Sequence, residues 1–257
     1  IVAAVEEGRA IYANMKAFIN FLITCNIGEV AAVFLSTLLG LPEVLGPLHL
    51  LWVNLVTDGP PATALGFNPP DPGNMRRPPR GRTDPLVSRF TLFRYILTGT
   101  YVGVATVGAF VHVYRSRGIP LSMLANWGAC SEWQVGDVPG FASACDAFGT
   151  GPGQGKAVAS TVALTTLVCM EMLRALCAVS ERESLLRKPP WANRYLLLGV
   201  TVPILLHMSV LYYPPLAAIF KLAPLARDSW WTVAMFSLPL VLLEELLKFA
   251  ARTLAGE

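Results

Sequence analysis

Six stretches of this 257-residue chain are apolar and long enough to cross a lipid bilayer. A helix that spans the hydrocarbon core needs about 20 mostly apolar residues. Hydrophobic residues make up 54% of the chain and charged residues only 14%, below the roughly 25% of soluble domains. The sequence therefore predicts an all-α membrane protein, a bundle of six transmembrane helices at roughly 17–39, 48–66, 91–113, 157–179, 195–213 and 229–250.

The second stretch contains a helix-breaking sequence, in which Gly59 is followed by Pro60 and Pro61. Glycine lowers helix stability, and proline lacks an amide donor and clashes with the preceding turn. We therefore expect the second helix to be broken at these three residues. Backbone carbonyls left free by such a break must face protein or a polar cavity, because lipid cannot hydrogen-bond to them. Transporters place ion sites at broken helices near the membrane midplane.

The basic residues predict how the chain is oriented. If the predicted spans alternate in direction, fourteen of the 20 lysines and arginines lie on the side of both termini and five on the other side, with Arg174 inside the fourth span. Cytoplasmic loops carry an excess of Lys and Arg, so we expect both termini to be cytosolic. Because topology accounts for the basic residues, the net charge of +3 requires no nucleic-acid partner.

The five cysteines divide by location. Cys130 and Cys145 fall in the long non-cytosolic loop, at about 114–155. If that side is an oxidising lumen, these two cysteines can form a disulfide; the alternative is two free thiols that share a loop. Cys25, Cys169 and Cys177 lie inside predicted spans, where a thiol usually packs as a small hydrophobic group.

Oxygen-bearing side chains lie inside three of the apolar stretches, although a carboxylate at bilayer depth costs about 2.5–3.5 kcal/mol or more. On the first span Asn26 and Glu29 are three residues apart, and on the second Asn54 and Asp58 are four apart, so each pair shares a helix face. The whole set is Asn26, Glu29, Asn54, Thr57, Asp58 and Glu171. An Asn or Thr taken singly could instead hydrogen-bond across helices.

The chemistry of this set indicates a hard cation. Calcium takes six to eight oxygens from carboxylates, amides and backbone carbonyls, in flexible geometry. The set offers that mixture and contains no sulfur and no imidazole, so soft metals are disfavoured. We therefore predict that these side chains bind a calcium ion that passes through the membrane.

Several segments resemble the sarco/endoplasmic reticulum type of P-type calcium ATPase. They are EGRAIYANMK at 7–16, NIGEV at 26–30, LWVNLVTDG at 51–59 and PATALGFNPPD at 61–71, and the likeness extends along nearly the whole chain. The resemblance implies membrane helices five to ten of such a pump, in the endoplasmic or sarcoplasmic reticulum membrane. Residues 1–16 would then be the end of the phosphorylation domain and the cytosolic stalk, and 17–257 the six-helix transmembrane domain.

The resemblance also implies two calcium sites. The first would use Asn26, Glu29, Thr57, Asp58 and Glu171. The second would use Asn54 and Asp58, together with ligands on a helix that this chain lacks, so that Asp58 bridges both ions. Calcium would be the transported ion, moved from the cytosol into the reticulum lumen.

The chain contains neither the phosphorylation motif DKTGT nor the actuator motif TGE. A P-type pump couples ATP to transport through an aspartyl phosphate, so we expect the chain alone not to be catalytic. Mg²⁺ and ATP would act only in the intact protein. The expected partners are the lipid bilayer and an N-terminal part with the phosphorylation, nucleotide and actuator domains and helices one to four. A small membrane regulator is a further possible partner.

Two other interpretations stay open at this point. A monovalent-cation P-type ATPase would also use Asn, Glu and Asp on corresponding helices, and a non-pumping membrane scaffold could derive from this half of a pump. Within the proposed site, Arg174 lies three residues after Glu171. It could pair with that carboxylate, or its long stem could carry the guanidinium elsewhere; we predict that it leans away.

Overall fold

A computed structural model of the chain describes most of its residues. These are residues 1–69, 75, 89–133, 138, 140, 141, 143–151, 154–179, 184, 185 and 189–254. Most of the basic residues counted between the second and third spans and between the fourth and fifth therefore lie outside the described residues, as does part of the predicted lumenal loop.

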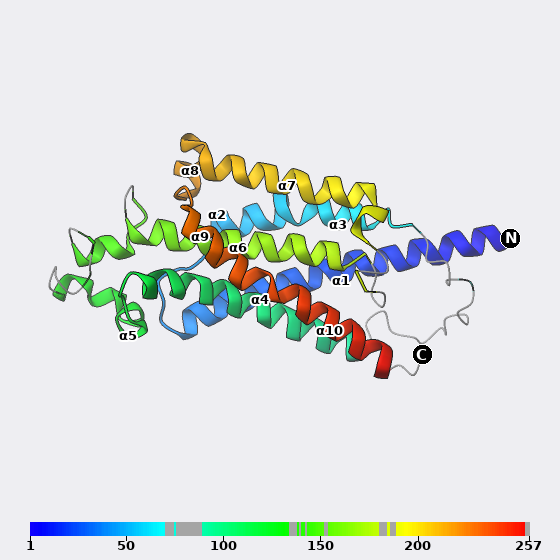
Figure 1. Cartoon of the computed structure of the whole chain (residues 1–257), viewed down its shortest axis with the longest axis horizontal. Helices are drawn as coiled ribbons and strands as arrows, with labels where there is room; N and C mark the ends of the chain where they lie inside the picture. The colour runs from blue at the N-terminus through cyan, green and yellow to red at the C-terminus, as the bar shows by residue number, and fades with distance from the viewer. Residues whose placement is uncertain are drawn as a thin grey trace.

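All regular secondary structure in the described residues is helical, which confirms the predicted all-α class. Four helices are long and apolar enough to cross a membrane: α1 (Val2–Leu38), α4 (Arg89–Ser116), α6 (Gly155–Cys177) and α7 (Arg194–Tyr212). They coincide with the first, third, fourth and fifth predicted spans. Of the four, α6 is the most deeply buried, and it lies in the middle of the bundle (Figure 1).

The second predicted span is interrupted, as expected, but the break begins before the prolines. Helix α2 (Pro47–Trp52) is followed by a π-helical turn (Val53–Thr57), by Asp58, and then by α3 (Gly59–Leu65). The two prolines occupy the first turn of α3. A proline is tolerated there because the first amides of a helix have no partner within it. The sequence Gly59-Pro60-Pro61 thus starts a helix, and the irregular backbone lies just ahead of it.

The sixth predicted span is also two helices, which the sequence analysis did not anticipate. Helix α9 spans Arg227–Ser237 and α10 spans Pro239–Leu254, and only Leu238 lies between them. Proline clashes with the carbonyl four residues earlier, so a helix does not run through it undisturbed. Pro239 was therefore the residue in the sequence that could have indicated this break. The prediction of a single continuous sixth helix is therefore wrong.

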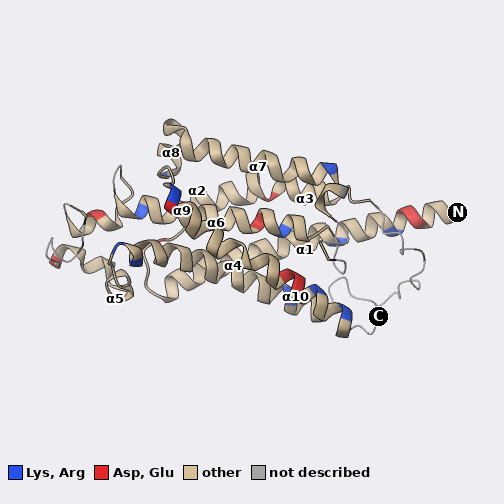
Figure 2. Cartoon of the chain, in the orientation of Figure 1, with Lys and Arg blue, Asp and Glu red and all other residues tan. Residues whose placement is uncertain are grey.

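The bundle is elongated, and its two ends differ. The start of α1 and the end of α10 lie at one end, while α5 (Leu121–Ala125) lies toward the other (Figure 1). Two shorter elements, α8 (Pro214–Phe220) and the 3₁₀ turn Pro190–Ala192, flank α7. Charged residues gather toward the ends of the bundle, and only a few lie along the middle of the helices (Figure 2). This distribution is that of a bundle whose middle faces hydrocarbon.

Helix α1 packs closely against α4 because glycine lets the two backbones approach. Gly99 and Gly103 are four residues apart on α4, a spacing that recurs where membrane helices touch. A Cβ atom on Gly103 would lie 2.6 Å from the Cβ of Ala31 and 2.8 Å from the amide nitrogen of Ala32. A Cβ on Gly99 would lie 2.5 Å from Ile27. These contacts hold in place the part of α1 that carries the predicted cation ligands.

Asn193 fixes the position of α3, the helix that follows Asp58. Its side-chain oxygen accepts a hydrogen bond from the amide of Leu196 at 3.1 Å and so caps α7. Its side-chain nitrogen donates to the Ala64 carbonyl at 2.9 Å, at the end of α3. One buried side chain therefore starts α7 and ties it to the broken second segment.

The close contact between α1 and α4 predicts the effect of adding one methyl group. Gly103→Ala should lower the free energy of unfolding by about 1–3 kcal/mol, because overpacking forces backbone shifts. Gly8→Ala is the matched control on α1: no atom lies within 4 Å of the added Cβ, and alanine favours a helix by up to about 1 kcal/mol. Unfolding in detergent micelles measures both. Equal stability of the two variants would contradict the proposed tight contact.

The two ends of the bundle predict which sites can be glycosylated. Gly128→Thr creates the acceptor Asn126-Trp127-Thr at an exposed turn beside α5, and no atom lies within 4 Å of a Cβ on Gly128. Arg76→Thr creates the matched acceptor Asn74-Met75-Thr in the stretch that the sequence predicts to be the cytosolic loop between the second and third spans. Translation into microsomes should give a glycosylated Gly128→Thr chain and an unmodified Arg76→Thr chain. The reverse pattern would invert the orientation inferred from charge.

Candidate cation site

Three carboxylates from three different elements are buried inside the bundle. Glu29 lies on α1, Asp58 at the junction between the π-helical turn and α3, and Glu171 on α6. Their exposed fractions are 7%, 1% and 1%. A buried charge must be paired or bound to a metal, so these three carboxylates need partners if they are ionised.

Two polar neighbours from the interrupted segment contact these carboxylates. The Asn54 amide donates a hydrogen bond of 2.6 Å to Glu29 Oε2. The Thr57 hydroxyl lies 3.4 Å from Glu171 Oε2 and 2.9 Å from the carbonyl of Val53 in its own turn. The interrupted segment therefore reaches α1 through Asn54 and α6 through Thr57.

The remaining predicted ligand, Asn26, is placed differently. Its amide donates to the Leu22 carbonyl of its own helix at 2.8 Å, and its side chain is exposed. Asn54 is also exposed, although it contacts Glu29. The predicted set thus comprises a buried group, made of Glu29, Thr57, Asp58 and Glu171, and two asparagines at an open face of the bundle.

Four carboxylate oxygens in this buried group accept no hydrogen bond from the described residues. They are Glu29 Oε1, both oxygens of Asp58 and Glu171 Oε1. Leaving a buried acceptor unpaired costs about 1–3 kcal/mol, and more for a charged group. The arrangement is therefore unfavourable by itself and becomes favourable when a cation supplies the missing partner.

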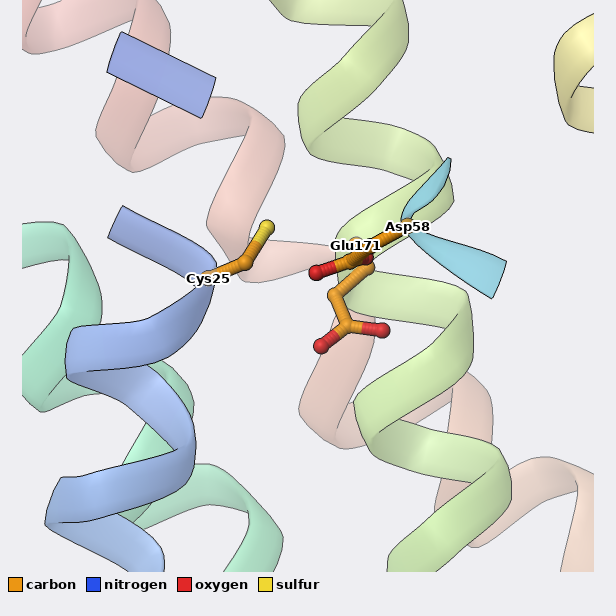
Figure 3. Close-up of side chains that lie close together, drawn as sticks. All are labelled: Cys25, Asp58 and Glu171. Atoms are coloured by element: carbon orange, nitrogen blue, oxygen red, sulfur yellow. The ribbon is translucent and has the colours of Figure 1, made fainter. Parts of the chain in front are cut away.

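A sulfur atom lies beside two of these three carboxylates, those of Asp58 and Glu171. The Sγ of Cys25 and a carboxylate oxygen each of Asp58 and Glu171 all lie within 4.8 Å of one another. Figure 3 shows the three side chains converging from α1, the start of α3 and α6. The structure thus places the thiol of Cys25 beside two of the predicted ligands, a neighbour that the predicted oxygen set did not include. The sequence could have indicated this proximity, because Cys25 lies four residues before Glu29 and therefore on the same face of α1.

Arg174 leans away from Glu171, which confirms the prediction. Its Nη1 lies 3.2 Å from Glu244 Oε1 on α10, and its Nη2 donates to the Asn20 carbonyl on α1 at 3.4 Å. Arg94 on α4 holds the other oxygen of Glu244 at 3.1 Å. Neither Glu244 nor Arg94 was among the predicted site residues, although a glutamate inside a predicted span indicates a functional or paired group. The positive charge nearest to Glu171 along the helix is thus paired with another acid.

The two cysteines of the long loop are joined in the structure. Cys130 lies in the 3₁₀ turn Trp127–Glu132 and Cys145 in the 3₁₀ turn Ala144–Phe148, and a disulfide links them. The second turn also contacts the bundle, because the Tyr114 hydroxyl on α4 donates to the Ala147 carbonyl at 2.8 Å. The two turns that the disulfide joins lie at the opposite end of the bundle from the start of α1 (Figure 1).

Comparison with known proteins gives one family. Residues 42–250 match the family described as "Cation transporting ATPase, C-terminus". Calcium-transporting ATPase 4, endoplasmic reticulum-type, of Arabidopsis thaliana is 49% identical over 100% of this chain and 26% of its own length. A calcium-transporting ATPase of Plasmodium falciparum is 47% identical over 98% of this chain and 21% of its own. Calcium-transporting ATPase 2, endoplasmic reticulum-type, of Arabidopsis thaliana is 46% identical over 98% and 26%. The chain spans about a quarter of the length of these relatives.

The paired arginines predict a large effect of neutralising their shared acid. Glu244→Gln removes the carboxylate that two mostly buried guanidinium groups share, and breaking a buried pair costs about 3–5 kcal/mol. Glu43→Gln is the matched control: Glu43 lies 3.9 Å from Lys156, its side chain is 58% exposed, and an exposed pair contributes about 0–1 kcal/mol. Unfolding in detergent micelles measures both variants. Similar small losses would show that the Glu244 cluster does not stabilise the bundle.

Proposed function

Because this chain belongs to the cation-transporting ATPase family, as the C-terminal membrane part of an endoplasmic reticulum-type P-type calcium ATPase, we propose that it forms most of the transport site of a calcium pump. The pump moves Ca²⁺ from the cytosol into the reticulum lumen. The observation that carries this proposal is the group of four buried carboxylate oxygens, on Glu29, Asp58 and Glu171, that lack partners among the described residues.

The donors present suit calcium better than a smaller divalent ion. Calcium accepts six to eight oxygens in flexible geometry, whereas Mg²⁺ demands a near-ideal octahedron and keeps several waters. The buried group supplies carboxylate oxygens from three separate elements and the hydroxyl of Thr57. A first ion would be the partner that these oxygens lack. Its ligands would be Asn26, Glu29, Thr57, Asp58 and Glu171. The bond that Asn26 makes within α1 uses its side-chain nitrogen, so its side-chain oxygen is the atom that would bind the ion.

The second ion would lie toward the open face, between Asn54 and Asp58. Asn54 is exposed there. Large apolar side chains are also exposed nearby in the sequence, among them Val30 on α1, and Leu51 and Leu55 on the interrupted segment. An open face beside a polar site fits a neighbouring helix outside this chain that supplies the remaining ligands. Asp58, with both oxygens unpartnered, is the side chain able to serve two ions at once.

The interrupted segments complete a six-pass membrane domain in this proposal. The α2–α3 segment crosses the bilayer as one unit, with Thr57 and Asp58 buried and with Asn54 at the open face that a helix outside this chain would cover. Helices α9 and α10 together make the sixth passage. Irregular backbone at membrane depth is acceptable only where protein or a polar cavity covers it. Six passages place both termini on the cytosolic side and the Cys130–Cys145 disulfide in the oxidising reticulum lumen.

The energy source lies outside this chain. ATP and Mg²⁺ would act in the phosphorylation, nucleotide and actuator domains of the intact protein, and residues 1–16 at the start of α1 would connect to them. Helix α1 continues without interruption from this cytosolic end to the ligand Glu29. A single rigid helix therefore provides a mechanical route from the catalytic domains to the site.

The shared ligand gives the sharpest test of this proposal. In the intact pump, Asp58→Asn should remove cooperative binding of two calcium ions, because a neutral amide replaces the carboxylate that serves both. Equilibrium binding of radioactive calcium to membranes measures the number of ions and their affinity. Asp228→Asn is the matched control, since Asp228 is exposed in the first turn of α9 and should bind calcium normally. Two ions bound by Asp58→Asn with normal affinity would exclude Asp58 as the bridging ligand.

A further inference from the structure

Cys25 adds a chemical property to the cation site that oxygen ligands alone do not have. Its side chain is 1% exposed, and its sulfur lies within 4.8 Å of carboxylate oxygens of Asp58 and Glu171. Both Asp58 oxygens and Glu171 Oε1 are buried, and no hydrogen bond from the described residues reaches them. A thiol therefore shares one polar pocket with two acids that have acceptor capacity to spare (Figure 3).

This donor set is that of a thiophilic metal. Thiolate sulfur selects soft and borderline metals, whereas oxygen-only sites suit calcium and magnesium. Zinc binds sulfur at about 2.3 Å and carboxylate oxygen at about 2.0–2.2 Å. Ligand atoms at these bond lengths around one tetrahedral ion lie about 3.6 Å apart. The three atoms here all lie within 4.8 Å of one another, so side-chain rotations are needed to bring all three to one ion.

We propose that Cys25, Asp58 and Glu171 form a site for a thiophilic divalent cation of the Zn²⁺ and Cd²⁺ class, and that this site overlaps the calcium site. When the ion binds, a metal–sulfur bond forms, the S–H bond of Cys25 breaks, and the proton leaves to solvent; no oxidation occurs. A metal deprotonates a coordinating thiol outright. Only the claim that the two sites overlap rests on the proposed calcium site, because Cys25 is not among the oxygen ligands assigned to calcium.

Two consequences follow for the pump. A thiophilic ion held by sulfur and two carboxylates would exclude calcium, because Asp58 and Glu171 would already be occupied. Such an ion would also leave slowly, since a metal–thiolate bond must break before it moves on. Cys25 thus makes the transport site sensitive to Zn²⁺ and Cd²⁺ in a way that an oxygen-only site would not be.

Cadmium is the probe, because cadmium–thiolate bonds absorb in the ultraviolet by charge transfer from sulfur. The whole 257-residue chain in lipid nanodiscs is titrated with Cd²⁺, and circular dichroism checks that each variant keeps its helices. Cys25→Ser should lose the absorption band and at least about tenfold in Cd²⁺ affinity, since loss of even an outer-shell partner typically costs 10–100-fold. Cys169→Ser is the matched control: this partly buried free thiol lies on α6 outside the cluster, and its removal should change neither readout.

The outcomes separate the two proposals. A cadmium–sulfur band that persists in Cys25→Ser, or Cd²⁺ binding without any such band, would overturn the thiophilic site and leave the calcium site standing. A band that depends on Cys25 in a chain that does not bind calcium would support the thiophilic site and count against the calcium site. Excess Ca²⁺ should abolish the band in the unmodified chain. A band that survives calcium saturation would show that the two sites do not overlap.

Discussion

The cost of burying three carboxylates in a membrane bundle governs the rest of this structure. Glu29, Asp58 and Glu171 are almost inaccessible, and four of their oxygens have no hydrogen-bond partner among the described residues. Such groups are stable only with a cation or with protons. This arrangement fits the proposed transport site, because a bound ion would stabilise the carboxylates and its departure would restore the unfavourable state.

The irregular second segment makes this site possible. The π-helical turn Val53–Thr57 directs Asn54 toward Glu29 and Thr57 toward Glu171. Single π turns occur often at functional sites because they shift the direction of side chains within a helix. Proline at the start of α3 then restores regular helix, and Asn193 holds the far end of α3 against α7. The irregularity is thus confined to the stretch that contains the predicted ligands Asn54, Thr57 and Asp58.

Charge balance outside the site matters as much as charge within it. Arg174 is only one turn from Glu171, and a guanidinium there could occupy the carboxylate permanently. Glu244 prevents this by holding Arg174 at 3.2 Å and Arg94 at 3.1 Å. Three helices, α4, α6 and α10, meet at this acid. The cluster therefore joins the bundle and keeps a fixed positive charge away from the cation site.

The sequence by itself determined the helical class, four of the spans and the presence of a break in the second segment, because hydropathy and helix-breaking residues are local properties. The oxygen ligands that it indicated stay a prediction. It also indicated that Arg174 leans away from Glu171. It did not determine where the second segment breaks, since prolines can start a helix as well as end one, and it missed the break at Pro239. Only the tertiary structure decided which ligands meet: it brought Cys25 beside Asp58 and Glu171, left Asn26 and Asn54 at an open face, and joined Arg94, Arg174 and Glu244. These pairings depend on the rotation and depth at which separate helices pack, and no pattern along a single helix contains that information.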